Sequence, residues 1–161
     1  MEVKSNGDLV IAGSQIGTSS SNYSIKSGQS FDGFDFAEIF ECDMPYDAGT
    51  VVCPHEILDV MTLCTHENCF AASVISGNPA FIFGGAYPES DLLLPVTLVG
   101  RINVKTSVPI AKRTMVVSDG KGGVLPVNKQ ENGYVIGIAL NEAVSGQVGI
   151  LLRSMRAESK P

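Results

Sequence analysis

Short apolar runs alternate with polar turn residues along most of this chain. The densest run is Asp35-Phe36-Ala37-Glu38-Ile39-Phe40-Glu41-Cys42. As a β-strand it would place alternate side chains on opposite faces. One face would then carry Phe36, Glu38, Phe40 and Cys42, and the other Asp35, Ala37, Ile39 and Glu41. Glu38 would lie between two phenylalanines, either as a buried carboxyl that exchanges a proton or as a carboxylate that is solvated or paired with a cation.

Further strands are predicted wherever an apolar run lies between two turn signals. These runs cover residues 49–53, 57–63, 70–75, 80–83, 95–105, 113–117, 134–140 and 146–153. The turn signals include Ser76-Gly77-Asn78-Pro79 and the glycine-rich segment 119–123. Regularly spaced turn signals between short apolar runs are typical of an all-β protein. They predict a compact β-barrel or sandwich of short strands. Residues 142–144 are predicted to form a helical turn.

The pattern also predicts three regions. Residues 1–34 are expected to form an extended N-terminal arm, because residues 14–30 are mostly Ser, Gly, Thr and Asn and have little to bury. Residues 35–153 would form the β-barrel or sandwich domain, and residues 154–161 a loose C-terminal tail. We expect the arm to lie on a neighbouring chain, to which Leu9, Val10 and Ile11 would add a strand.

Composition excludes several classes of partner. The 161 residues carry 11 Lys and Arg against 17 Asp and Glu, a net charge of -6, which disfavours a nucleic-acid partner. No apolar run reaches the ~18–20 residues of a membrane-spanning helix, so no membrane partner is expected. The first residues also lack the apolar core of a signal peptide. We therefore expect synthesis in a cytoplasm, with reduced thiols and no disulfide.

Cysteine and histidine are concentrated in one part of the chain, since all four cysteines and both histidines lie between residues 42 and 69. Thiolate and imidazole are ligands suited to zinc. A zinc site would use Cys53, His55, Cys64, His66 and Cys69. The predicted strand 57–63 would span roughly 23 Å and hold the two halves of this set apart. We therefore predict no metal or other cofactor, with zinc as the alternative.

Other candidate chemistry has a simpler explanation in each case. The carboxylates Asp32, Asp35, Glu41, Asp43 and Asp47 lack the ordered spacing of a calcium loop, so a solvated acidic edge is predicted. No nucleophile-elbow pattern is present, and Ser76 to Pro79 is predicted to be a tight turn. The segment 120–123 lacks the spacing of a phosphate-binding loop and is predicted to be a hairpin tip.

Several of these segments together resemble a known phage domain. The stretch Asp35-Phe36-Ala37-Glu38-Ile39-Phe40-Glu41 is similar to the Asp-Tyr-Ala-Glu-Tyr-Phe-Glu motif of the autoproteolytic C-terminal chaperone of bacteriophage appendage and tail-spike proteins, a domain of glutamic-peptidase type. The similarity continues through residues 75–79, 95–104, 135–140 and 148–152. The later segments also resemble small phage β domains such as capsid decoration and head-fibre proteins.

The resemblance implies a β-rich domain that forms a trimer. In the family the domain drives assembly of a fibre and is then released by a cut before the motif Asp, which requires the Glu three residues later. Carried over, the scissile bond is Phe34–Asp35, and the catalytic residues are Asp35 and Glu38. A carboxylate so close to a strained peptide bond can act as base or nucleophile. Phe34 is bulky where the family has a small residue, which favours a domain that keeps the fold without using the cut.

The leading hypothesis is therefore a virion structural protein: a small trimeric capsid decoration protein or head- or tail-fibre protein. Its partners would be two further copies of itself and the major capsid protein or fibre subunits. Phe36, Ile39 and Phe40 are the predicted oligomer contacts. The first alternative is a self-cleaving intramolecular chaperone that uses Asp35 and Glu38, and the second is a small zinc-binding protein.

Overall fold

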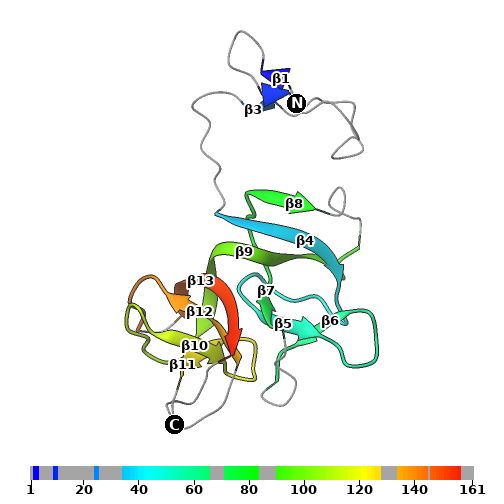
Figure 1. Ribbon diagram of the computed structural model, residues 1–161. Helices are drawn as coiled ribbons and strands as arrows, with labels where there is room; N and C mark the ends of the chain where they lie inside the picture. Colours follow the sequence, from blue (N-terminus) through cyan, green and yellow to red (C-terminus); the bar gives the residue numbers. More distant parts are fainter. Residues whose placement is uncertain are drawn as a thin grey trace.

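The computed structural model is built from strands (Figure 1). It describes residues 34–65, 71–83, 90–127, 134–144 and 146–156, together with the short strands at 2–3, 9–10 and 24–25. The described residues contain no helix, which confirms the all-β prediction. None of them forms a helix that could cross a bilayer.

The strands form three sheets, and their bounds follow in chain order. They are β1 (Glu2–Val3), β2 (Leu9–Val10), β3 (Ser24–Ile25), β4 (Asp35–Glu41), β5 (Val51–Pro54), β6 (Met61–Leu63), β7 (Ser73–Val74), β8 (Phe81–Phe83), β9 (Leu93–Thr106), β10 (Met115–Ser118), β11 (Val124–Pro126), β12 (Tyr134–Ala139) and β13 (Gly146–Arg156). The largest sheet has seven strands in the order β11-β10-β12-β13-β9-β4-β8, and a smaller sheet has the order β6-β5-β7. The third sheet has the order β1-β2-β3.

The 14-residue strand β9 connects the parts of the large sheet. Its first half pairs antiparallel with β4, from Leu93 opposite Glu41 to Gly100 opposite Asp35. Its second half pairs with β13, as far as Thr106 opposite Gly146. A register shift lies between Phe36 and Ala37, and there Leu98 is the extra residue of β9. In Figure 1, β4 and β8 lie on one side of β9, and β10 to β13 extend from its other end.

The two larger sheets are joined by isolated bridges and by a shared core. Cys42 at the end of β4 bridges to Met61, and Ile75 after β7 bridges to Val96 of β9. The main core brings Val51 and Val74 of the smaller sheet together with apolar side chains of β9, β10, β12 and β13. A sandwich describes this packing; the sheets do not close into a barrel, because β8 and β11 remain separate edges of the seven-stranded sheet.

Two local predictions are corrected by the structure. The helical turn predicted at 142–144 does not form, because Ala143 forms a bridge with Ile110 through two backbone hydrogen bonds of 2.8 and 2.9 Å. The strand predicted at 57–63 begins only at Met61. The preceding residues form a bend in which the Nδ1 atom of His55 accepts hydrogen bonds from the backbone N–H groups of Ile57 and Leu58, both at 3.1 Å.

The lead-in predicted as an extended arm contains β1, β2 and β3, which pair with each other. Leu9 pairs with Val3 on one side and with Ile25 on the other. Leu9 and Val10 therefore already have a strand on each side and offer no free edge to a neighbouring chain in this arrangement. The third predicted arm contact, Ile11, lies outside the described residues, as does the predicted tail apart from the end of β13.

Candidate functional site

Strand β4 carries different chemistry on its two faces. The register pairs Ala37 with Thr97 on one face, and Asp35 lies on this face because its carboxylate contacts the Thr97 side chain. It pairs Glu38 with Val96 of β9 and with Phe83 of β8 on the opposite face. This separation confirms the predicted alternation along residues 35–42. It also means that Asp35 and Glu38, the two predicted catalytic carboxylates, lie on opposite faces of one strand and do not converge within a single chain.

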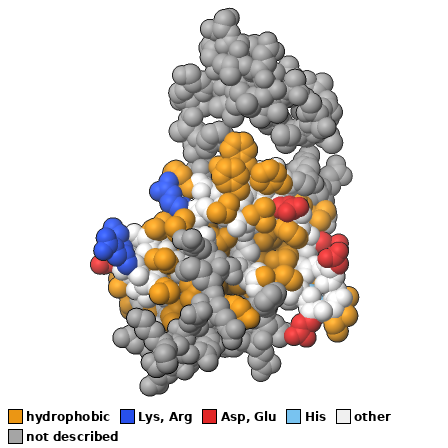
Figure 2. All heavy atoms as spheres, viewed as in Figure 1, with side chains coloured by type: hydrophobic (Ala, Val, Ile, Leu, Met, Phe, Trp, Pro, Cys, Tyr) orange, Lys and Arg blue, Asp and Glu red, His pale blue; other side chains and the backbone are white. Residues whose placement is uncertain are grey.

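The face that carries Glu38 exposes a group of aromatic rings. The Phe36 ring stacks on the Phe81 ring with centroids 5.1 Å apart, and the Phe83 ring lies 6.4 Å from the Phe36 ring. All three side chains are between 37% and 48% exposed, so they do not belong to the core. Val99 is opposite Phe36 in the register and is also exposed. We call Phe36, Phe81, Phe83 and Val99 the aromatic face; Figure 2 shows hydrophobic side chains gathered where β4 and β8 lie.

The other two predicted oligomer contacts have different surroundings. Phe40 is half-buried and packs against the smaller core cluster of Cys42, Val52, Met61, Ile75 and Val96. Ile39 is also half-buried. Of the three predicted contacts, Phe36 is therefore the one whose ring is available to another molecule.

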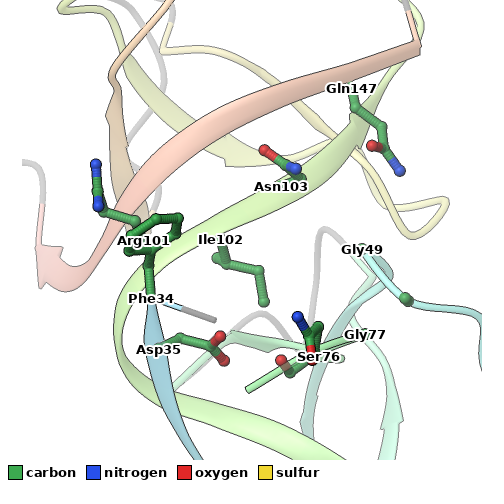
Figure 3. A pocket seen from close by; sticks show the side chains of 11 residues that line it. Phe34, Asp35, Gly49, Ser76, Gly77, Arg101, Ile102, Asn103 and Gln147 are labelled. Atoms are coloured by element: carbon green, nitrogen blue, oxygen red, sulfur yellow. The ribbon is translucent and has the colours of Figure 1, made fainter. Parts of the chain in front are cut away.

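On the opposite side of β4, at the start of the strand, lies a cleft of about 370 Å³ (Figure 3). Three strands and two turns contribute to it: the start of β4, the middle of β9, the start of β13 and the turns at 48–49 and 76–78. Asp35, Gly49, Ser76 and Ile102 are buried and form its floor. The rim consists of the exposed residues Phe34, Ala48, Gly77, Asn78, Arg101, Asn103 and Gln147.

Asp35 is held at the floor by its own backbone and by one side chain. Its carbonyl oxygen accepts a hydrogen bond from the Ala80 N–H at 2.8 Å. Its Oδ2 atom accepts a hydrogen bond from the Thr97 hydroxyl at 2.8 Å, and the residue is only 3% exposed. The sequence-based prediction of a solvated acidic edge is therefore wrong for Asp35, because pairing of β4 with β9 turns this side chain inward. It holds for Glu41, Asp43 and Asp47, which are exposed, while Asp32 lies outside the described residues.

The second carboxylate oxygen of Asp35 opens onto the cleft. No described residue donates a hydrogen bond to it, and no buried side-chain oxygen or nitrogen in the described part of the chain lacks a partner. This oxygen must therefore reach solvent, which it can do through the cleft that Asp35 lines. The same argument applies to the Ser76 hydroxyl, whose residue is 4% exposed. Figure 3 shows the Asp35 carboxylate and the Ser76 side chain pointing toward each other across the opening.

The peptide bond between Phe34 and Asp35 lies at one end of the cleft. The Phe34 carbonyl oxygen accepts a hydrogen bond from the Arg101 N–H at 3.0 Å, and the Arg101 guanidinium lies 3.9 Å from the centroid of the Phe34 ring. Gly100 allows this close approach, because a Cβ atom there would lie 2.4 Å from the Phe34 oxygen and because its φ is +130°. The phage resemblance pointed to Phe34 and Asp35 as site residues. Ser76 and Arg101 lie in the resembling segments 75–79 and 95–104, but they were not assigned a role in a site.

The predicted cysteine and histidine site is not assembled in the described part of the chain, where no three potential ligands converge. Cys53 is buried. The Nδ1 atom of His55 already accepts hydrogen bonds from the backbone of the bend that follows it. Cys64 is disulfide-bonded, which corrects the prediction of reduced thiols. That prediction depended on an assumed compartment, whereas a disulfide depends on whether two sulfurs are held at bonding distance. His66 and Cys69 lie outside the described residues.

No protein-family model, no curated protein and no solved structure matches the chain.

Proposed function

We propose that this protein is a self-associating structural protein of a phage particle, a small β domain that contacts copies of itself and neighbouring capsid or fibre subunits. Support for the phage assignment comes from the resemblance of residues 35–153 to phage chaperone and decoration domains. Support for self-association comes from the aromatic face, which is the single observation that carries the proposal.

The aromatic face is suited to a protein partner because it is apolar and its rings are already stacked. Two of its rings stack at an interplanar angle of 10°, so little side-chain freedom would be lost on association. Burying an exposed phenylalanine contributes about 1.5–3 kcal/mol, and large aromatic residues dominate many interfaces. The face also lies beside β8, an edge strand of the seven-stranded sheet in the described part of the chain. A second chain there would cover both the rings and the edge.

A trimer is the oligomer that the phage resemblance implies. The glutamate on the same face, Glu38, is half-buried and lies opposite Phe83 in the register. A second copy of the chain that covered this surface would have to leave Glu38 at the solvent-exposed rim of the interface or provide a hydrogen-bond donor to its carboxylate. The test of self-association therefore changes the phenylalanines and leaves Glu38 in place.

The oligomeric state of purified protein tests the proposal. Light scattering coupled to size exclusion should give three times the chain mass for the wild type. Phe81→Ser and Phe36→Ser should shift this mass toward that of one chain while the far-UV spectrum stays β-rich. Ile57→Ser is the matched control, because Ile57 is 87% exposed, lies outside the aromatic face, and its loss should leave the oligomer unchanged. A wild-type protein that remains a monomer, or aromatic-face variants that associate like the wild type, would contradict the proposal.

Self-cleavage at Phe34–Asp35 is the second candidate, and it is favoured by the surroundings of that peptide bond. A backbone N–H group, that of Arg101, points at the Phe34 carbonyl oxygen, as a donor in an oxyanion hole does. The Asp35 carboxylate lies beside the same bond in a cleft that water can enter. Hydrolysis would consume one water and leave a carboxylate on Phe34 and a free amine on Asp35.

Mass spectrometry of freshly made protein distinguishes the two candidates. Self-cleavage predicts a fragment that begins at Asp35, is absent from Asp35→Asn and is still formed by the control variant Asp91→Asn, which removes an exposed carboxylate outside the cleft. The Glu38→Ala variant tests whether the carboxylate on the opposite face takes part. Intact chain in every sample would exclude the cleavage function and leave the structural proposal in place.

A further inference from the structure

The buried carboxylate of Asp35 has no positive partner in the described part of the chain. The ion pair found there joins Lys105 to Asp47, and among the described residues the sole donor to the Asp35 carboxylate is the neutral hydroxyl of Thr97. Removing a carboxylate from water without a cation is costly, so such groups are usually paired. One of its oxygens nevertheless faces an open cleft, which leaves a place for a cation to be supplied from outside.

The rest of the cleft provides further acceptors and a short apolar wall. The Ser76 hydroxyl faces Asp35 and has no hydrogen-bond partner among the described residues. Carboxamides from Asn78, Asn103 and Gln147 line the rim, and each offers a carbonyl oxygen. The Ile102 side chain contributes an apolar surface to the floor. We propose that this cleft binds a primary ammonium group carried on an alkyl stem.

An ammonium group fits this set better than other ligand chemistries. It is a compact charge with three donors, which matches one carboxylate oxygen, one hydroxyl and a carboxamide oxygen. An anion would face the buried carboxylate of Asp35, and Arg101, the positive residue of the rim, already places its guanidinium over the Phe34 ring. The net charge of -6 also favours the approach of cations over that of anions. The proposal is independent of the aromatic face, which lies on the other side of β4.

The same chemistry has two sources: a lysine side chain of a partner protein, or a free alkyl amine or polyamine. Both can be compared by following backbone amide signals in NMR titrations of the full chain. The probes are Nα-acetyl-lysine methylamide, its Nε-acetylated form, and the diamine cadaverine. The Nε-acetylated form keeps the stem and removes the charge. It should bind at least about tenfold more weakly, since a charge-assisted hydrogen bond is lost.

The chemical-shift changes of the backbone amides should saturate as the amine concentration rises. The affected amides should be those of Gly49, Ser76, Gly77 and Asn103. Tighter binding of the lysine probe than of cadaverine would identify a protein side chain as the ligand, and the reverse would identify a free amine. Asp35→Asn should weaken binding about tenfold or more, while Asp91→Asn, which removes the same charge outside the cleft, should not change it. Ser76→Ala should weaken binding by a smaller factor.

Comparison of the charged and acetylated lysine probes on the wild-type protein tests the ammonium site even if Asp35→Asn fails to fold. Equal binding of the two lysine probes, an absence of saturable shifts with every amine, or shifts confined to residues outside the cleft would overturn the proposal.

Discussion

Thr97 donates a hydrogen bond to Asp35 at 2.8 Å, although the two residues are 62 positions apart in the chain. Both side chains are buried, and the contact exists because β4 pairs with the first half of β9. The backbone carbonyl of Thr97 in turn accepts a hydrogen bond from the Ser73 hydroxyl. Strands β4, β9 and β7 are thus connected through one threonine, which fixes the direction in which the Asp35 carboxylate points.

Replacing Thr97 by Val should destabilise the protein by about 1–3 kcal/mol, because the volume is kept while a buried carboxylate loses its donor. Urea unfolding at neutral pH measures the change in the free energy of unfolding. Thr62→Val is the matched control: the Thr62 hydroxyl donates to Asp43 at 2.7 Å, but this pair is exposed. Water can replace that bond, so the control should cost about 0.5 kcal/mol. Equal costs for the two variants would contradict the role assigned to Thr97.

Replacing Gly100 by Ala should destabilise the protein by more than about 2 kcal/mol, because two costs add. The φ of +130° is unfavourable for a residue with a side chain, and the new Cβ atom would lie 2.4 Å from the Phe34 oxygen. Gly146 separates the two costs, because its φ is +90° but a Cβ atom added there would meet nothing within 4 Å. Gly146→Ala should therefore cost about 1 kcal/mol. Thermal or urea unfolding of both variants measures the difference, and an equal loss would exclude the close approach at Phe34.

Much of the strand pattern could be predicted from sequence, since alternation and turn residues report directly on local structure. The prediction at 134–140 corresponds to β12, and the glycine-rich tip predicted at 120–123 connects β10 to β11. The prediction at 57–63 was too long, because Ile57 and Leu58 are apolar yet exposed and are held in a bend by His55. Hydrophobicity alone does not distinguish such a bend from a strand.

The candidate site was less predictable because it is assembled from distant segments. Alternation placed Asp35 and Glu38 on opposite faces of β4, but it gave no information about which face is covered. That depends on β9, whose bulge at Leu98 changes the register beside Phe36. Ser76 follows a two-residue strand, and its sequence predicted only a tight turn. It lies opposite Asp35 because Ile75 bridges to Val96, a pairing that no local pattern encodes.

The free thiols of Cys42 and Cys53 should be unreactive in the native protein. Both are buried. Burial, with smaller contributions from the charges of Asp43 and Glu41, raises the pKa of Cys42 to about 11, and burial followed by the charge of Asp43 raises the pKa of Cys53. Because the thiolate is the reactive form, iodoacetamide should label neither residue in mildly alkaline buffer and should label both in guanidinium chloride. Peptide mass spectrometry identifies the labelled sites, and rapid native labelling of either cysteine would contradict their burial.

Tyr46 should make the stability of the protein decrease at alkaline pH. Its hydroxyl donates to Asp43 at 2.6 Å and accepts a hydrogen bond from the Leu63 N–H at 2.9 Å. The pKa of Tyr46 is raised from 10.0 to about 12. Burial is the main cause of this rise, and the hydrogen bond to Asp43 is the next. The folded state therefore keeps the phenolic proton after the unfolded state has lost it. The stabilisation is complete below pH 10 and is lost as the pH rises through 12.

The variant Tyr46→Phe isolates this contribution, because it cannot ionise while every other titrating group remains. At neutral pH it should be less stable than the wild type by about 0.5–1.5 kcal/mol, since the Leu63 N–H loses its acceptor. As the pH rises from 10 to 12, the wild type alone loses the phenolic contribution, so the difference between the two unfolding free energies should narrow. Urea unfolding across this range measures it. A difference that stays constant would show that Tyr46 ionises equally easily in both states, and that its contact with Asp43 does not hold the proton.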